Sequence, residues 1–237
     1  MTGGNHDFTL DPFHPKTTRE KYLRTRYLFT SAHALSRGVH YLDSEVKAIT
    51  LQACSRGGKE LPAIAVPIYG NQHQPEFLGK EYAFIYRPYP SPESEIPWRS
   101  APTKADGVNI WVLHGGPKGH LDAIPLPRLE GCTVAARKIA QARPQLCVFG
   151  HFHVSYGVKR VKFQDDSEEV TTTEIITKNS SVPNIYDFSR NGSGGGLKAG
   201  TETVFVNAAW MTGLGAKTTA RNRAVVVDLD LPVSHDS

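Results

Sequence analysis

Two histidines that could bind a metal ion follow a short apolar run in the second half of the chain. The run from Leu146 to Phe149 predicts a buried strand, and it leads through Gly150 to His151 and His153. A neutral imidazole is the commonest metal ligand in proteins. Two imidazoles spaced two residues apart can face one cavity if the backbone bends there, which a glycine permits. Taken alone, the pair is compatible with both a metal site and an ordinary surface turn.

Two other polar groups favour the metal site. Asn5, His6 and Asp7 form a polar cluster near the start of the chain, and His114 ends the apolar run Val108–Leu113. Open α/β sheets bind ligands at the carboxyl ends of their strands, so we expect these groups to meet the histidine pair. Imidazole nitrogens and an Asn carbonyl oxygen suit borderline ions such as manganese, iron, zinc or nickel.

His6 and Asp7 are the candidate catalytic residues. A histidine that does not bind the metal can protonate a leaving oxygen or stabilise the charge on a phosphoryl group. Asp7, which follows His6 directly, could orient its imidazole and raise its basicity. The three groups together therefore predict metal-assisted chemistry on a small anionic substrate.

The elements that must position these residues follow an α/β pattern. A helix is predicted from Thr17 or Thr18 to about Leu35, and a second from Cys132 to Arg143, which Pro144 stops. The predicted strands are Val39–Leu42, Val46–Ala53, Leu61–Ile68, Val108–Leu113, Leu146–Phe149, Val154–Phe163, Thr203–Asn207 and Ala224–Leu229. Strand, long helical crossover and strand, in that order, favour parallel neighbours in one sheet.

Two longer stretches do not fit regular elements. Residues 70–105 combine many prolines with aromatic side chains, which predicts an ordered wrap with a part that faces the substrate. Residues 164–200 are polar and carry the glycine run Asn191–Gly196. This run lacks the strand-then-helix context of a phosphate-binding loop, so we predict a flexible surface insertion.

The composition indicates one soluble domain over residues 1–237. The formal net charge is +4 without a concentrated run of Lys or Arg, which argues against a nucleic-acid partner. Three cysteines at no ligand spacing predict reduced thiols in a cytoplasmic protein. No apolar run has the length of a membrane span, and the first residues do not form a signal peptide.

Three ordered motifs resemble the second half of the calcineurin-like metallophosphoesterase signature. They are Gly4-Asn5-His6-Asp7, His114-Gly115-Gly116-Pro117 and Gly150-His151-Phe152-His153. The segment from His114 to Asp122 is also similar to the His-Gly-Pro-Pro-x-Gly-x-x-Asp pattern of the metallophosphoesterase-domain-containing subgroup. The resemblance covers almost the whole chain, apart from residues 164–200.

The resemblance implies a four-layer α/β/β/α sandwich that holds two metal ions. By analogy, Asn5, His114 and His151 would bind one ion and His153 would bind the other. His6, with Asp7 behind it, would assist the phosphoryl oxygen or the leaving group. The implied reaction is hydrolysis of a small phosphate ester or nucleotide, including a cyclic nucleotide, by a metal-bound hydroxide.

The departures from the family pattern matter as much. The signature begins with Asp-x-His and Gly-Asp motifs, and neither precedes Gly4 in this sequence. Those motifs supply carboxylates that offset the repulsion between two dications, whereas the four candidate ligands here are neutral. We therefore expect at most one bound ion. We also expect that roughly the first βαβ portion is missing and that an apolar sheet edge or face is exposed.

The alternative function is a catalytically impaired remnant. Such a protein would bind a nucleotide monophosphate or a single metal ion without turnover. A nuclease acting on nucleic acid is a weaker third reading, because the sequence has no basic patch.

Overall fold

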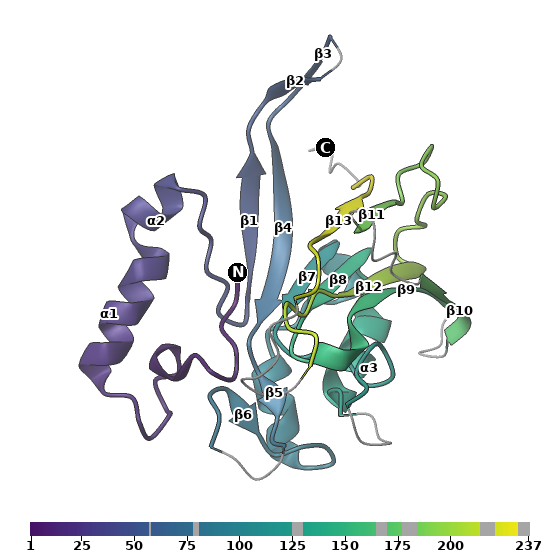
Figure 1. Cartoon of the computed structure of the whole chain (residues 1–237). Coiled ribbons are helices and arrows are strands. Elements are labelled where there is room, and N and C mark those ends of the chain that lie inside the picture. Colours follow the sequence, from purple (N-terminus) through teal and green to yellow (C-terminus); the bar gives the residue numbers. More distant parts are fainter. Residues whose placement is uncertain are drawn as a thin grey trace.

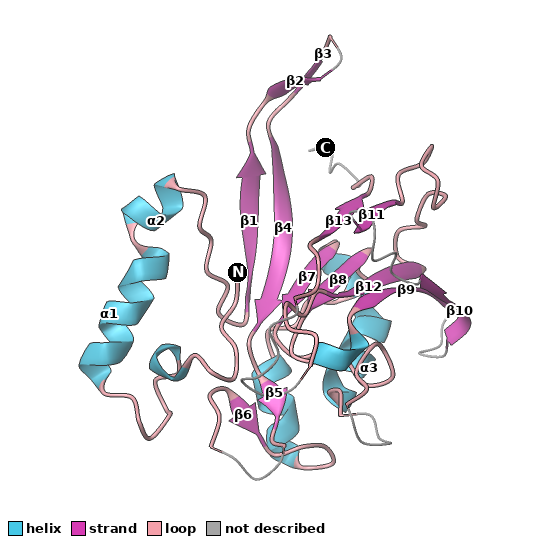
Figure 2. Cartoon of the chain, in the orientation of Figure 1, coloured by secondary structure: helices cyan, strands magenta, loops and turns pink. Residues whose placement is uncertain are grey.

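A seven-stranded sheet forms the centre of the molecule. The computed structural model describes residues 1–56, 58–77, 81–124, 130–164, 170–176, 184–213 and 221–231. In spatial order the strands are β1 (Glu45–Leu51), β4 (Ile64–Asn71), β7 (Ile110–Leu113), β8 (Leu146–Phe149), β12 (Glu202–Asn207), β9 (Gly157–Phe163) and β10 (Val170–Ile176). Figure 2 shows this sheet crossing the molecule, which confirms the predicted α/β class.

The middle of the sheet is parallel and its margins are antiparallel. β4, β7, β8 and β12 run in the same direction, whereas β1, β9 and β10 pair antiparallel with their neighbours. Helix α3 (Thr133–Ala142) makes the crossover from β7 to β8. The predicted strand–helix–strand unit is thus confirmed, and it brings the carboxyl ends of β7 and β8 to one edge.

Alternating side chains give this sheet a core on each face. Trp111, Cys147 and Phe205 point to the side where α3 packs with Val134 and Ile139. The intervening residues point to the opposite side. That side is covered by a two-stranded parallel sheet of β11 (Asn184–Asp187) and β13 (Val225–Asp228). The described elements are therefore layered helix, sheet and sheet in this region (Figure 1).

The β1–β4 hairpin extends beyond the rest of the sheet. It continues into a short hairpin of β2 (Cys54–Arg56) and β3 (Lys59–Leu61), and the whole ribbon projects from the body in Figure 1. The predicted strand Val39–Leu42 is wrong. Its residues form an irregular segment in which the Leu42 amide donates to the Met1 carbonyl at 2.9 Å.

The first predicted helix is divided in two. Helix α1 (Arg19–Thr30) begins after the cap Thr18, and Ser31 both ends it and caps α2 (Ala32–Ser36). Both helices lie on the other side of β1 from the main body (Figure 1). Helix α1 has no buried residue, so its position owes little to core packing.

The proline-rich stretch 70–105 is a wrap of short elements. It contains a parallel pair of β5 (Gln74–Pro75) and β6 (Ile85–Tyr86), and the 3-10 helices η2 (Pro92–Trp98) and η3 (Lys104–Asp106). Trp98 is fully buried in the core on the α3 side. The prediction of an ordered, irregular wrap is confirmed for its described residues.

The stretch 164–200, predicted as a flexible insertion, contributes strands β10 and β11 to the two sheets. Residues 165–169 and 177–183 within it lie outside the described residues. Its glycine run folds as turns, and the Arg160 guanidinium donates to the Gly194 carbonyl at 2.7 Å. Strand β9 starts at Gly157 rather than Val154, because the 3-10 helix η4 (His153–Ser155) precedes it.

Cys132 and Cys147 are buried and Cys54 is exposed, and all three are free thiols. None of the helices that the structure describes has the length and apolarity needed to cross a lipid bilayer.

Candidate metal centre

The ends of two adjacent parallel strands bring His114 and His151 together. His114 follows β7 and His151 follows β8, and their ring centroids lie 5.0 Å apart. The Gly150 amide donates to the His114 carbonyl at 3.0 Å, which ties the two strand ends together. The bend that aims the second ring is at His151 itself, whose φ of 67° is left-handed, and not at Gly150 as the sequence suggested.

The N-terminal loop places Asn5 against His114. The Asn5 Oδ1 lies 2.9 Å from the His114 Nε2, and the Asn5 backbone N lies 3.2 Å from the same nitrogen. The loop is anchored from its other side, where the Ala83 amide donates to the Asn5 carbonyl at 3.0 Å. Gly4 packs directly on the imidazole, since a Cβ atom there would lie 2.6 Å from ring atoms of His114.

Asp7 contacts the backbone rather than the neighbouring imidazole. Its Oδ2 accepts from the Gly4 amide at 2.7 Å, while its own amide donates to the Gly4 carbonyl at 2.9 Å. These bonds close the turn that carries Asn5. His6 is exposed and makes edge contacts with Tyr82 at 5.3 Å. The structure therefore gives Asp7 a role in shaping the loop, in place of the predicted orientation of His6.

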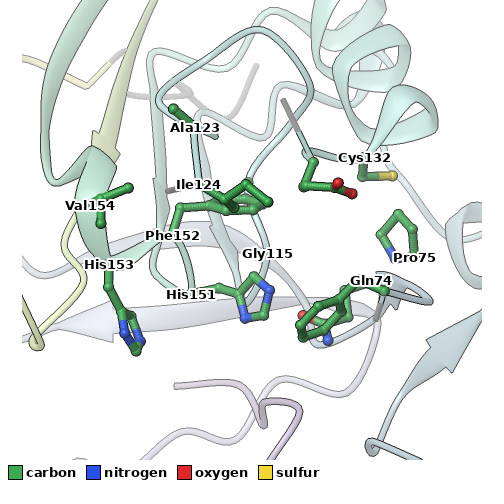
Figure 3. A pocket seen from close by; sticks show the side chains of 13 residues that line it. Gln74, Pro75, Gly115, Ala123, Ile124, Cys132, His151, Phe152, His153 and Val154 are labelled. Carbon is green, nitrogen blue, oxygen red and sulfur yellow. The ribbon is translucent and has the colours of Figure 1, made fainter. Parts of the chain in front are cut away.

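His153 lies beside His151 on the same side of a cavity (Figure 3). The His153 Nδ1 is 2.8 Å from the Gly213 carbonyl oxygen, which fits a ring N–H donating to that oxygen. This bond leaves the Nε2 lone pair available as an acceptor or a metal ligand.

Burial keeps the two central imidazoles neutral. It lowers the pKa of His114 to about 4, with a smaller contribution from the charges of His6 and His153. It lowers the pKa of His151 to about 3, with smaller contributions from the other three histidines. The neutral form is the one that binds metal ions, so proton competition at these two rings is weak near neutral pH.

The donor set fits one ion better than two. Two ligand atoms that are each about 2.1 Å from one ion lie roughly 3 Å from each other when they occupy neighbouring positions. Asn5 Oδ1 and His114 Nε2, at 2.9 Å, have about that separation. Among the residues that the structure describes, no three His, Cys, Asp or Glu side chains are grouped for metal binding. A pair of imidazoles with an amide oxygen is therefore the available set, and it offers no bridging carboxylate.

Two cavities flank the centre. One of about 320 Å³ is lined by Thr2, Gly3, Gly4, Asn5, His6, Asp7, Val112, Leu113, His114 and Gly150. The other, of about 90 Å³, is lined by Gln74, Pro75, Phe77, Gly115, Gly116, Ala123, Ile124, Glu130, Cys132, His151, Phe152, His153 and Val154 (Figure 3). All six residues predicted for the site thus line one cavity or the other.

Sequence reasoning did not single out Gln74 or Phe77. Their only signal was the aromatic content of the proline-rich wrap, which indicated a part that faces the substrate. His120, which lies in the loop after His114, lines neither of these two cavities. Its ring instead stacks on Phe205 with 4.2 Å between centroids.

Comparison with known proteins supports one superfamily. The chain is 29% identical over 162 residues to metallophosphoesterase domain-containing protein 1 of Homo sapiens, and equally to that of Mus musculus. Each match covers 67% of this chain and 45% of the relative, so the chain spans less than half of these relatives. No protein-family model matches the chain. The similarity supports the metallophosphoesterase superfamily.

Proposed function

We propose that this chain carries the centre of a metal-dependent phosphoesterase, with cyclic nucleotides as the first substrates to test. The observation that supports this most is the approach of Asn5 Oδ1 to His114 Nε2 at 2.9 Å beside His151. The predicted four-layer sandwich belongs to the same proposal, as do manganese, iron, zinc and nickel as candidate ions. We further propose a cytoplasmic location, with no membrane or nucleic-acid partner.

The proposed ion would be held by Asn5, His114 and His151. When bound, it would neutralise phosphate charge and lower the pKa of a water nucleophile. The chain supplies the rest. Burial holds His114 and His151 neutral, and the exposed imidazole of His6 can donate a proton to a leaving oxygen. His153, fixed by the Gly213 carbonyl, would contact a phosphoryl oxygen or a second, weaker ion.

Hydrolysis of bis-p-nitrophenyl phosphate with added manganese tests this proposal. We expect turnover by the wild-type chain, with about one ion bound per chain in equilibrium dialysis. His114→Ala should lower kcat/KM by about 100-fold or more, as loss of a site-forming ligand does. The matched control is His33→Ala, an exposed histidine on α2, which should leave turnover unchanged. Absence of manganese-dependent turnover in the wild type would refute the proposal.

A second candidate function is binding without hydrolysis. It is favoured by the wholly neutral donor set, which lacks the anionic bridge that stabilises two adjacent ions. Calorimetry with AMP and with manganese decides between the two. Heat of binding without turnover would support a binding protein, and no heat in either titration would exclude it.

A further inference from the structure

Gln74 is a buried amide whose polar atoms have no partner within the protein. Its side chain is 2% exposed, and neither Oε1 nor Nε2 makes a hydrogen bond. The nearby buried amides differ. Asn71 Nδ2 donates to the Tyr69 hydroxyl at 2.9 Å, and Gln72 Nε2 donates to Asp43 at 2.5 Å. Leaving a buried polar group unpaired destabilises a fold. Among the described residues several have one such atom, but Gln74 alone has two, which calls for a functional explanation.

The fold holds this amide at the cavity shown in Figure 3. The Gln74 backbone is fixed in β5, where its amide donates to the Phe84 carbonyl at 3.1 Å. Gly115 leaves room for the side chain, since a Cβ atom there would lie 3.3 Å from Gln74 Cβ and 3.6 Å from Oε1. Gln74 thus lies in the wall of a largely apolar cavity, with both polar atoms just beneath its surface.

The rest of the wall suits a flat ring. Phe77, Ile124 and Phe152 line the cavity, and aromatic side chains favour stacked or edge contacts with other rings. Phe77 is itself held in place, stacked on Tyr82 with 4.8 Å between centroids and an angle of 7°. An engineered cavity of about 150 Å³ holds benzene. At about 90 Å³ this cavity is smaller, so it would hold only part of a ring, and the ring's substituent would lie outside.

The cavity and the candidate metal centre share a wall. His151 and His153 line the cavity, and the Phe77 ring meets His151 edge-on at 4.9 Å. A ring in the cavity would therefore lie next to a phosphoryl group held at the imidazoles. This placement connects Gln74 with the substrate of the proposed reaction.

We propose that the cavity binds a planar heteroaromatic ring of the ester, and that Gln74 determines which rings are accepted. The preferred ring carries a hydrogen-bond donor beside an acceptor on one edge. When the side chain turns toward the cavity, the Gln74 carbonyl accepts from the ring donor and its amide N–H donates to the ring acceptor, which satisfies both atoms. The link to a phosphate ester rests on the proposed function, whereas the ring preference can be measured without it.

Titrations with 2-pyridone and toluene, followed by ligand-observed NMR, test the ring preference. Pyridone has a donor beside an acceptor, and toluene has neither. We expect Gln74→Met to shift the ratio of the two dissociation constants about 10- to 30-fold toward toluene, the loss of two neutral hydrogen bonds. The matched control Gln52→Met changes an exposed glutamine between β1 and β2 and should leave the ratio unchanged.

Thermal unfolding separates a binding residue from a structural one. Replacing an unpaired buried amide with an apolar chain of similar size should raise the melting temperature by roughly 2 to 8 °C. A fall in melting temperature with an unchanged ratio would overturn the proposal. Gln74→Glu, which keeps the acceptor and loses the donor, provides a second variant, and it should favour 2-aminopyridine over 2-pyridone.

The outcomes distinguish this inference from the proposed function. One outcome is manganese-dependent hydrolysis together with the same ratio of dissociation constants in wild type and Gln74→Met. It would mean that solvent satisfies the amide, so the ring preference would fail and the proposed function would stand. A ring preference that depends on Gln74, without hydrolysis, would remove the proposed enzyme activity and keep the binding site.

Discussion

At the scale of single residues, the candidate centre depends on how closely the N-terminal loop approaches His114. The approach is possible because residue 4 has no side chain, and a Cβ atom there would lie 2.6 Å from the imidazole. From this position the Asn5 Oδ1 lies 2.9 Å from the His114 Nε2. The smallest residue in the loop thus controls the contact between two candidate ligands.

We predict that Gly4→Ala displaces the His114 ring and weakens manganese-dependent turnover. A shift of about 1 Å in a catalytic group can cost about 100-fold in rate, and we expect a loss of that order. Steady-state hydrolysis and manganese titration measure it. Gly150→Ala is the control, because the nearest atom to its new Cβ is 3.9 Å away, and it should lower turnover less than about threefold. Equal losses in both variants would contradict the prediction.

A second residue-scale prediction concerns His120 and the pH dependence of stability. Burial lowers the pKa of His120 to about 4, with a smaller effect from the charge of Lys159. The unfolded chain has the ordinary value near 6.5, so it binds the proton more tightly than the folded protein. The contribution of a neutral His120 is therefore present above about pH 6.5 and is lost as the pH falls toward 4.

Between about pH 7 and pH 5, protonation of His120 should lower the free energy of unfolding of the wild type by about 2 kcal/mol. We expect this part of the loss to be absent in His120→Gln. Urea unfolding at the two pH values measures the difference. Because His114 and His151 titrate in the same direction, the test is the change on substitution and not the total slope. An identical pH dependence in variant and wild type would show that the His120 ring is solvated.

At the scale of elements, the start of α3 joins the sheet core to the wrap. Cys132 is the helix cap, and its sulfur accepts from the Ala135 amide at 3.1 Å. The same sulfur lies 2.7 Å from the Tyr86 hydroxyl, which also accepts from the Trp98 indole at 3.2 Å. One buried thiol thus caps α3, the crossover helix between β7 and β8, and also contacts Tyr86 of β6.

We predict that Cys132→Ala lowers the free energy of unfolding by about 1 to 2 kcal/mol, because it removes the cap and a partner of Tyr86. Cys132→Ser should lower it less, since serine is among the preferred capping residues. Guanidinium unfolding of the two variants gives the comparison. A serine variant as unstable as the alanine variant would show that the thiol contributes by packing alone.

At the scale of the whole molecule, large apolar side chains are exposed on α1 and on the edge strand β1. Leu23, Tyr27 and Leu28 of α1 are 53%, 67% and 63% exposed, and Leu51 of the edge strand β1 is 50% exposed. This agrees with the expected exposed apolar surface near a sheet edge. Contiguous apolar surface and unpaired edge strands both promote association between molecules.

We expect Leu28→Lys to reduce concentration-dependent association while changing the free energy of unfolding by less than about 0.5 kcal/mol. Sedimentation velocity and urea unfolding measure the two effects. Ile139→Ala on α3 is the contrasting variant, because that side chain is 1% exposed and its truncation should cost about 2 to 5 kcal/mol. A large loss of stability in Leu28→Lys would mean that α1 is packed more tightly than its exposure indicates.

The sequence by itself determined the elements of the core and the edge at which the chemistry lies. Short continuous apolar runs predict strands such as β7 and β8, and the helical spacing after Cys132 predicts α3. A helical crossover between parallel strands then places His114 and His151 at one edge, as predicted. These predictions rest on local sequence patterns, which a single sequence contains in full.

Only the tertiary structure decided how closely the predicted loops approach and which atoms contact each other. Asn5 and His114 are 109 residues apart, and nothing in either motif specifies their 2.9 Å contact. The partner of Asp7, the stacking of His120 and the unpaired amide of Gln74 depend in the same way on surrounding segments. Hydrogen bonds and burial of a side chain are set by all elements packed around it, so spacing along the chain cannot supply them.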